Sequence, residues 1–377
     1  MAYATIPGHL TRLTELDDAW ATTGAGARLA AVRAAARRLH DRLTSGGPAV
    51  AVRTADVATF PYPTRFGLEG AARSIAPFVM MRNRVQLVQV KIGAELINVL
   101  VNPSDPERSL AAPFFAEQLA RYGNFVSRRV MSQQHGTTAS ALAAWGVDPA
   151  DIHYVTFDHL HVQDVRGLLG TIVPEPGQRQ PTRALLPNAR LLAQRSELAT
   201  LEEPHPLQRH WYVAGGILGV DPQKLIALDG DYALGAGLAL VRTPGHTIGN
   251  HSIAMVTDRG VWTVSENGVA VDAYAPEASA IAGLSGFARA RGVEVILNAN
   301  TREHTLDQYT SMVLEKTLAD PCPDRPEFPQ HFSSSELVRH PLAPGLGPTY
   351  SHGAITHGQL EGRRAAAPSS SRPSAQA

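Results

Sequence analysis

The chain has 377 residues, of which 44% are hydrophobic and 18% charged, a composition typical of one large globular domain or two modest ones. Its 34 basic and 34 acidic side chains leave no formal net charge, which argues against a nucleic-acid partner and favours a small-molecule ligand. One cysteine, Cys322, excludes an intramolecular disulfide, and the lack of a secretory leader pattern or of ~18 consecutive apolar residues predicts a cytoplasmic protein without a membrane partner.

The first 79 residues are predicted to form a helical extension, with helices over 10–20 and 27–43. The second helix is expected to end at Ser45-Gly46-Gly47-Pro48, because glycine and proline stop helices. Its apolar side chains recur at helical spacing and share one face. They are Leu29, Val32, Ala36, Leu39 and Leu43. Arginines cover the remaining surface, which indicates a solvated face or, alternatively, a contact between two copies in a homo-oligomer.

Residues 80–318 are expected to form the main domain, because sheet-forming segments begin there. Alternating apolar residues over 84–90 and 95–101, with a turn at 91–94 between them, predict a β-hairpin. Later strands are predicted at 152–157, 190–194, 224–228, 238–241, 252–256, 261–264 and 293–297. Helices are predicted at 106–122, 137–145, near Ser196, at 276–291 and at 305–318. Strands in two batches, alternating with helices, predict a layered α/β arrangement.

Other segments have less regular patterns. Residues 319–362 are predicted to form a C-terminal extension, and the Ala-, Pro- and Ser-rich residues 363–377 a disordered tail. The segment 202–220, which includes Trp211, is either an insert that covers a binding site or a packed surface excursion. The stretch from Phe60 to Pro63 is either a lid or a linker.

The most informative motif is His159-Leu160-His161, which follows the strand predicted at 152–157. Side chains two apart in extended backbone lie on the same side of the chain, so both imidazoles can face one ligand. Neutral imidazole is the commonest metal ligand, and two from one short loop reduce the cost of ordering a site. Since the chain has 15 histidines, such a pair also arises by chance, and a metal site needs further ligands.

Two more strand ends carry residues of ligand type. The turn Thr243-Pro244-Gly245-His246-Thr247 follows an apolar strand and would present His246 from a tight bend. The strand predicted at 261–264 leads into Ser265-Glu266, which places a carboxylate at its end. If these three strand ends converge, they supply the preorganised ligands that a metal site requires.

Together these segments resemble the metallo-β-lactamase superfamily, whose members carry H-x-H-x-D-H after a strand, then a T-P-G-H-T turn and an acid at a later strand end. The resemblance covers about residues 80–318. It implies an α/β fold, the four-layer αββα sandwich, with one or two divalent metal ions. It also implies that His159, His161 and His246 hold the first ion.

The sequence departs from the family pattern at the second ion. Gln163 stands where the family has its motif aspartate, and Asp164 stands where it has the next histidine. The resemblance implies Asp164 and Glu266 as ligands there, with Glu266 in place of the bridging aspartate. The family's last ligand, a histidine, falls nearest Asn300, or at His304 after a shift of about one helical turn, and we expect His304.

Three further residues have open roles. Asp158 directly precedes the motif and would orient His159 by a hydrogen bond behind the ligand shell. His352 and His357 lie in the C-terminal segment and would reach the site only if that segment folds back.

Two kinds of chemistry fit such a centre. In the first, a metal ion lowers the pKa of bound water toward ~7 for hydrolysis of a small-molecule substrate, with Asp164 and Glu266 as the catalytic carboxylates. Zinc is expected, with iron or manganese as alternatives. In the second, the harder oxygen ligands Asp164 and Glu266 favour a non-haem di-iron oxygenase. A catalytically inactive ligand-binding protein is the third possibility, and hydrolysis is the expected function.

Overall fold

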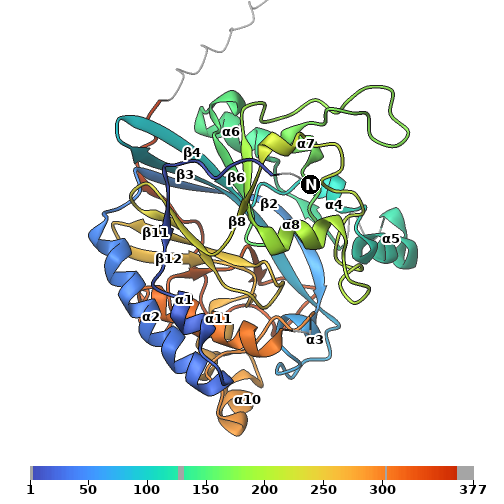
Figure 1. Ribbon diagram of the computed structural model, residues 1–377. Coiled ribbons are helices and arrows are strands. Elements are labelled where there is room, and N and C mark those ends of the chain that lie inside the picture. The colour runs from blue at the N-terminus through green and yellow to red at the C-terminus, as the bar shows by residue number, and fades with distance from the viewer. Residues whose placement is uncertain (1–2, 126–130, 302–303, 363–377) are drawn as a thin grey trace, which may run out of the picture.

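Two β-sheets lie face to face at the centre of the molecule, and helices cover the outer face of each (Figure 1). This architecture is seen in a computed structural model that describes residues 3–125, 131–301 and 304–362. Side chains of both sheets meet in one buried cluster, which joins Val88 and Ile226 of the larger sheet to Leu240 and Met255 of the smaller one. The predicted αββα arrangement is therefore confirmed. Among the described residues, no helix is long and apolar enough to span a membrane.

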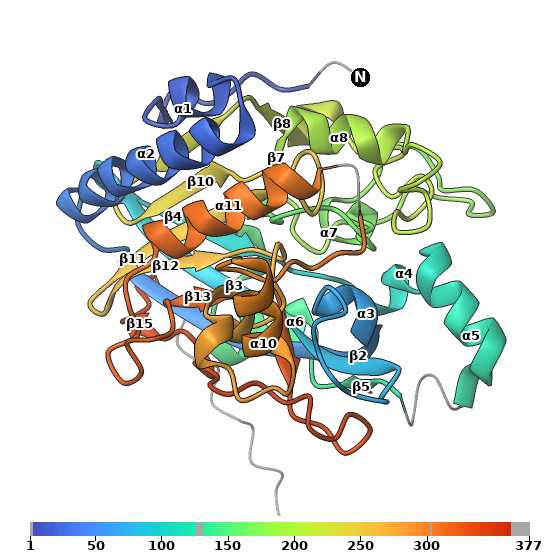
Figure 2. The same cartoon turned by 90° about the horizontal axis from the view of Figure 1, so that it is seen from below.

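The smaller sheet has the strand order β1-β9-β10-β11-β12-β13. Its strands are β1 (Leu10–Leu13), β9 (Asp231–Leu234), β10 (Leu238–Arg242), β11 (His251–Thr257), β12 (Gly260–Val264) and β13 (His331–Phe332). Its outer face is covered by α2 (Ala25–Ser45) and α11 (Thr305–Leu318), which lie side by side in Figure 2. Val32 of α2 and Leu314 of α11 share a buried cluster with Val241 of β10, which fixes both helices on this sheet.

The larger sheet has the order β15-β2-β3-β4-β6-β7-β8. Its strands are β15 (His357–Gly358), β2 (Ala51–Pro63), β3 (Phe78–Ile92), β4 (Glu95–Val101), β6 (Tyr154–Thr156), β7 (Arg190–Gln194) and β8 (Leu225–Leu228), while β5 (Gln133–Gln134) pairs with β2 and β14 (Ser335–Val338) with β3. Strands β4, β6, β7 and β8 are parallel, so their carboxyl ends meet at one edge. Loops that follow parallel strands at such an edge are the usual place for a ligand site.

The remaining helices are shorter. They are α1 (Asp17–Ala21), α3 (Thr64–Gly67), α4 (Pro106–Ser109), α5 (Pro113–Phe125), α6 (Thr138–Trp145), α7 (Arg166–Leu169), α8 (Arg195–Glu202), α9 (Val271–Tyr274) and α10 (Leu284–Arg291), with 3₁₀ turns at Pro149–Asp151, Pro222–Lys224 and Pro276–Ala278. Leu142 and Trp145 of α6 and Leu198 of α8 belong to the buried cluster that also holds Leu191 of the larger sheet. Helices α6 and α8 therefore cover the larger sheet as the fourth layer, whereas α1 packs against α2.

The predicted hairpin is present as β3 and β4, which pair Ile92 with Glu95 around Gly93. Gly93 has a φ of 61°, a conformation that glycine adopts without steric cost. The predicted helix 27–43 is present within α2, and the helix predicted at 305–318 coincides with α11. These elements have long, clear apolar periodicity, which explains why the sequence indicated them.

The first 79 residues are not a helical appendage. The predicted helix 10–20 contains strand β1, which pairs with β9, and only α1 is helical in its second half. Strand β2, which was not predicted, pairs with β3 from Ala51 to Pro63. It mixes strand-forming valine, threonine and aromatic residues with alanine and two prolines, so its pattern is weak and pairing with β3 supports its strand form. Residues 319–362 likewise supply β13 to one sheet and β14 and β15 to the other. The tail 363–377 lies outside the described residues.

Two other predicted elements differ. The helix predicted over 106–122 is interrupted between α4 and α5, because Pro113 lacks the N–H that a continuous helix needs. The prediction of a strand at 293–297 was wrong. This buried segment is irregular, and the backbone N–H of Ile296 donates a hydrogen bond to the carbonyl oxygen of Ala273. The edge position beside β12 is taken by β13 instead.

Candidate metal centre

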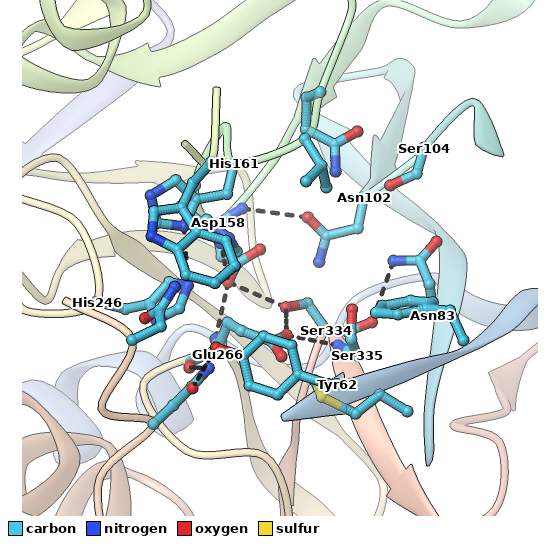
Figure 3. A pocket seen from close by; sticks show the side chains of 18 of the residues that line it. Tyr62, Asn83, Asn102, Ser104, Asp158, His161, His246, Glu266, Ser334 and Ser335 are labelled. Atoms are coloured by element: carbon cyan, nitrogen blue, oxygen red, sulfur yellow. Dashed lines mark hydrogen bonds and ion pairs between the residues drawn. The ribbon is translucent and has the colours of Figure 1, made fainter. Parts of the chain in front are cut away.

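The loop after β6 carries His159 and His161, both buried. Figure 3 shows His161 beside His246. Asp158 accepts a hydrogen bond from His159 Nδ1 at 3.0 Å, which leaves His159 Nε2 free to bind a ligand. The backbone N–H of Asp158 donates to Asn102 Oδ1 at 3.1 Å, so the loop after β4 fixes the loop after β6. The predicted role of Asp158 behind His159 fits these contacts.

Val162 directly follows the two histidines and has a φ of 56°, a left-handed conformation that is costly for a β-branched residue. Its N–H donates to the carbonyl of Trp211 at 2.7 Å. Gly216 approaches the same loop so closely that a Cβ atom would lie 2.7 Å from the carbonyl oxygen of Gln163. The segment 202–220 is thus packed against the motif loop and holds it in a strained conformation, as occurs at functional sites.

His246 meets the other two histidines from the turn between β10 and β11. Its N–H donates to Asn267 Oδ1 at 3.0 Å, and Gly245 lies where a Cβ atom would be 2.2 Å from Gln308 Cα of α11. The turn therefore needs glycine at 245 in order to pack against α11. The ring centroids of His246 lie 4.5 Å from His159 and 4.9 Å from His161.

One nitrogen of each imidazole lies within 4.8 Å of the others. His161 Nδ1 and His246 Nε2 are 3.2 Å apart, close to the ~3.3 Å that separates two nitrogens bound to one tetrahedral zinc ion at ~2.0–2.1 Å. Burial holds the pKa of His161 and of His246 well below the usual histidine value, so both rings are neutral, the form that binds metals. Three such nitrogens fit one divalent ion with a coordination position left for water or substrate.

Glu197, at the start of α8, joins the two histidine-bearing loops. Its Oε1 accepts from the N–H of Leu160 at 2.8 Å and from the hydroxyl of Tyr212 at 3.0 Å, and its Oε2 accepts from Thr247 Oγ1 at 2.6 Å. Leu160 lies between the two motif histidines, and Thr247 follows His246. Glu197 thus fixes the distance between the ligand loops, although it is too far along the chain from either for its role to be evident from the sequence.

Replacing Glu197 by alanine is expected to lower the free energy of unfolding by about 3 kcal/mol, because it leaves several buried donors unpaired. Metal affinity should fall about 10- to 100-fold, as for other groups that position ligands. Thermal unfolding and zinc titration measure the two effects. Glu203→Ala, an exposed position one residue past the end of the same helix, is the matched control. Unchanged zinc affinity in Glu197→Ala would show that the loops do not need this clamp.

Glu266 lies near the histidines but outside their group. Its backbone N–H donates to Asp158 Oδ2 at 2.8 Å, and its Oε2 accepts from Ser334 Oγ and, at 2.6 Å, from the N–H of Ser335. Oε1 is buried without a protein partner. Burial, together with the carboxylate of Asp158, raises the pKa of Glu266 to about 8. The group is therefore placed to hold or release a proton at the centre.

Two predicted ligands are not brought to the cluster. Both oxygens of Asp164 are taken up by arginines, at 3.1 Å to Arg108 and 2.5 Å to Arg166, and Asp164 does not line the cavity at the histidines. His304 precedes α11 and does not line that cavity either. Asn300 does line it, so the ungapped alternative fits the structure better than the shift to His304. His304 lies at the start of α11, whereas Asn300 lies in the preceding loop, at the end that faces the histidines.

Of the three remaining residues considered from the sequence, two lie outside the cavity and one forms part of its wall. His352 contacts the carbonyl of Pro329, and His357 contacts Asp258, and neither lines the cavity. Gln163 lines the cavity wall. No sequence motif indicated Ser334 or Ser335, because the pairing of β14 with β3 that brings them to Glu266 links segments about 250 residues apart.

The histidines open onto a small cavity of about 60 Å³ with an aromatic wall formed by Tyr62, Phe114 and Trp211. The rings of Phe114 and Trp211 are in contact, with centroids 4.8 Å apart and planes tilted by 36°. A groove of about 690 Å³ continues from this cavity, and Phe60 and Phe115 line both. The segment 202–220 and the stretch at 60–63 therefore contribute walls to the site.

No protein-family model matches the chain. Among solved structures it is similar to a probable metal-dependent hydrolase from Staphylococcus aureus, with 13% identity over 70% of this chain and 82% of that chain and a TM-score of 0.47. It is also similar to a dizinc quorum-quenching lactonase in complex with a homoserine product, with 14% identity over 83% of this chain and 96% of that chain and a TM-score of 0.46. A third similar structure is that of a hydrolase of the β-lactamase superfamily, with 14% identity over 82% of this chain and 94% of that chain and a TM-score of 0.44. At these identities and TM-scores, the likeness does not extend to substrate or mechanism, and the geometry of the site has to carry any functional conclusion.

Proposed function

We propose that the protein is a metal-dependent hydrolase of an uncharged small molecule, with its ion held by His159, His161 and His246. The observation that carries this proposal is the convergence of three buried imidazoles, with His161 and His246 nitrogens 3.2 Å apart. A divalent ion held there supplies a Lewis acid that lowers the pKa of bound water toward ~7. All-nitrogen ligation by imidazole favours zinc over magnesium or calcium, with iron and manganese as alternatives to be tested.

Glu266 is proposed as the group that accepts and returns the proton. Its free Oε1 lines the cavity, while its other oxygen is fixed by Ser334 and Ser335. A general base whose pKa is close to the working pH is effective in both directions of proton transfer. Asp158 is proposed to orient His159 and not to react, because its Oδ2 already contacts His159, Ser334 and the N–H of Glu266.

The substrate is proposed to react through an uncharged carbonyl, such as that of an ester or lactone. None of the described residues that line the cavity is a lysine or an arginine, so no cation there pairs with a phosphate or carboxylate. Amides and hydroxyls of Asn83, Asn300 and Ser104 supply neutral polar contacts instead. The aromatic wall favours an apolar group beside the reacting carbonyl and excludes water from it.

The oxygenase alternative depended on Asp164 and Glu266 together as oxygen ligands. Because Arg108 and Arg166 hold the carboxylate of Asp164, the centre lacks one of the two oxygen ligands that would favour iron and dioxygen chemistry. A ligand-binding protein without catalysis remains the contrasting hypothesis, and it predicts no turnover with or without metal.

Removal of the metal is expected to abolish hydrolysis. After dialysis against a zinc chelator, turnover of neutral aryl esters and lactones should fall to the background rate, because no Lewis acid remains at the histidines. Adding zinc back should restore it. The assay compares the untreated, metal-depleted and zinc-restored protein on the same substrates. A depleted protein that retains its full rate would overturn the proposal.

A further inference from the structure

We infer that the centre binds one cation only, because the side chains that would hold a second ion are engaged by other groups of this chain, lie outside the cavity or are poor metal ligands. This inference rests on the proposed function, because it presupposes that His159, His161 and His246 bind the first ion. The second position is the one for which Asp164, Glu266 and a residue at 300 or 304 were the candidates, with Gln163 in place of the family's motif aspartate. Each of these side chains is bound by other groups of the protein, lies outside the cavity, or is a neutral amide that binds zinc poorly.

Asp164 is neutralised by protein cations. Arg108 and Arg166 both bind its Oδ2, and Arg166 also donates from Nε and from its backbone N–H to Oδ1 at 2.9 and 3.0 Å. Glu175 completes the cluster, accepting from Arg108 at 2.9 Å and from Arg166 at 2.9 Å. Two acids thus balance two arginines, with the side chain of Asp164 only 3% exposed.

An ion that used Asp164 would have to displace buried arginine pairs and then lie beside their positive charges. Removing one partner from a largely buried ion pair is strongly unfavourable, and a divalent cation beside the two arginines adds electrostatic repulsion. Figure 3 shows the polar groups that do face the cavity, and Asp164 is not among its lining residues. The arginine cluster therefore excludes this carboxylate as a ligand.

Glu266 alone offers one free oxygen. Ser334 and Ser335 take up Oε2, and both belong to the segment that leads into and begins β14. A single carboxylate oxygen does not form a metal site, since even catalytic zinc sites use three protein ligands.

The other candidate that is not an amide, His304, does not line the cavity. Gln163 and Asn300 line the cavity, and Asn298 is engaged by the hydroxyl of Tyr62 at 2.8 Å. Neutral amide oxygens suit hard cations with many oxygen ligands better than they suit zinc. Within residues 3–125, 131–301 and 304–362, the three-histidine group is also the one cluster of histidines, cysteines or acids close enough to hold an ion.

Zinc titration of the whole metal-free protein tests the inference. Calorimetry and metal analysis after gel filtration should give one zinc ion per chain. Two tightly bound ions would overturn the single-ion inference and leave the hydrolase proposal intact. No bound ion would overturn the hydrolase proposal itself, so the two failures are distinguishable. Cobalt provides a second readout that does not depend on activity, since its visible absorption should saturate at one equivalent.

Asp164→Asn extends the test to the arginine cluster. This variant is expected to keep one zinc ion with unchanged affinity, because Asp164 is not a ligand. Glu175→Gln is the matched control, since it disturbs the same arginines at a residue that was never a ligand candidate. Loss of zinc in Asp164→Asn but not in Glu175→Gln would make Asp164 a ligand and overturn the inference. If neither variant folds, the count of ions in the natural protein decides alone.

Discussion

Purified His159→Ala/His161→Ala protein is expected to contain no bound metal. The double substitution removes two of three nitrogen ligands, and the single imidazole of His246 does not retain an ion. Hydrolysis should fall to the background rate, because the Lewis acid is lost together with its ligands. Metal analysis of the protein and its zinc affinity by titration measure the effect.

The control for this variant is His205→Ala, which removes an exposed histidine outside the cavity. It should keep the full metal content and rate. Circular dichroism separates loss of ligands from loss of fold, and the double variant should retain the secondary structure because the motif loop is also held by Glu197 and Asn102. A folded double variant with full metal content would refute the ligand assignment.

Glu266→Gln is expected to lower kcat by about 10² to 10⁴ while leaving one metal ion bound. The amide keeps nearly the same shape and can still accept from Ser335, but it cannot take a proton from water. The loss should lie in kcat and not in KM, because the group acts on the reacting water and not on the substrate's apolar part. Steady-state kinetics with metal analysis of the same samples measures both.

Ser334→Ala is the matched variant, since it removes a hydrogen bond to Glu266 and leaves the carboxylate itself in place. Its kcat should fall by a smaller factor, about tenfold, because only the orientation of Glu266 is disturbed. Equal kcat in Glu266→Gln and the natural protein would remove Glu266 from the mechanism. Loss of the ion in Glu266→Gln would instead make it a ligand.

The raised pKa of Glu266 also has a consequence for the stability of the metal-free protein. A carboxyl group whose pKa is about 8 when folded and 4.5 in its ordinary state binds its proton more tightly in the folded protein. Its contribution to stability is therefore complete at low pH and is lost as the pH rises from about 4.5 through 8. Glu266→Gln should remove this component of the pH dependence, which denaturant unfolding of metal-free samples at several pH values can measure.

The sequence determined the parts of this protein that depend on short-range pattern. The period-two alternation on both sides of Gly93 predicted β3 and β4, and the helical spacing of Val32, Leu39 and Leu43 predicted α2, because each pattern is complete within one element. The motifs around His159 and His246 predicted the three-nitrogen cluster, because each histidine ends a strand and strand ends converge at one edge of a layered α/β fold.

Only the tertiary structure decided which carboxylates serve the centre. Asp164 and Glu266 are equally plausible ligands in the sequence, yet Asp164 meets Arg108 and Arg166 whereas Glu266 meets Ser334. Arg108 and Ser334 lie 56 and 68 residues along the chain from the carboxylates that they contact, although Arg166 follows Asp164 closely. Strands β2 and β14 reach their places through pairing with β3, which links segments distant in the sequence. A side chain's chemistry depends on which groups surround it after folding, and long-range contacts set those groups.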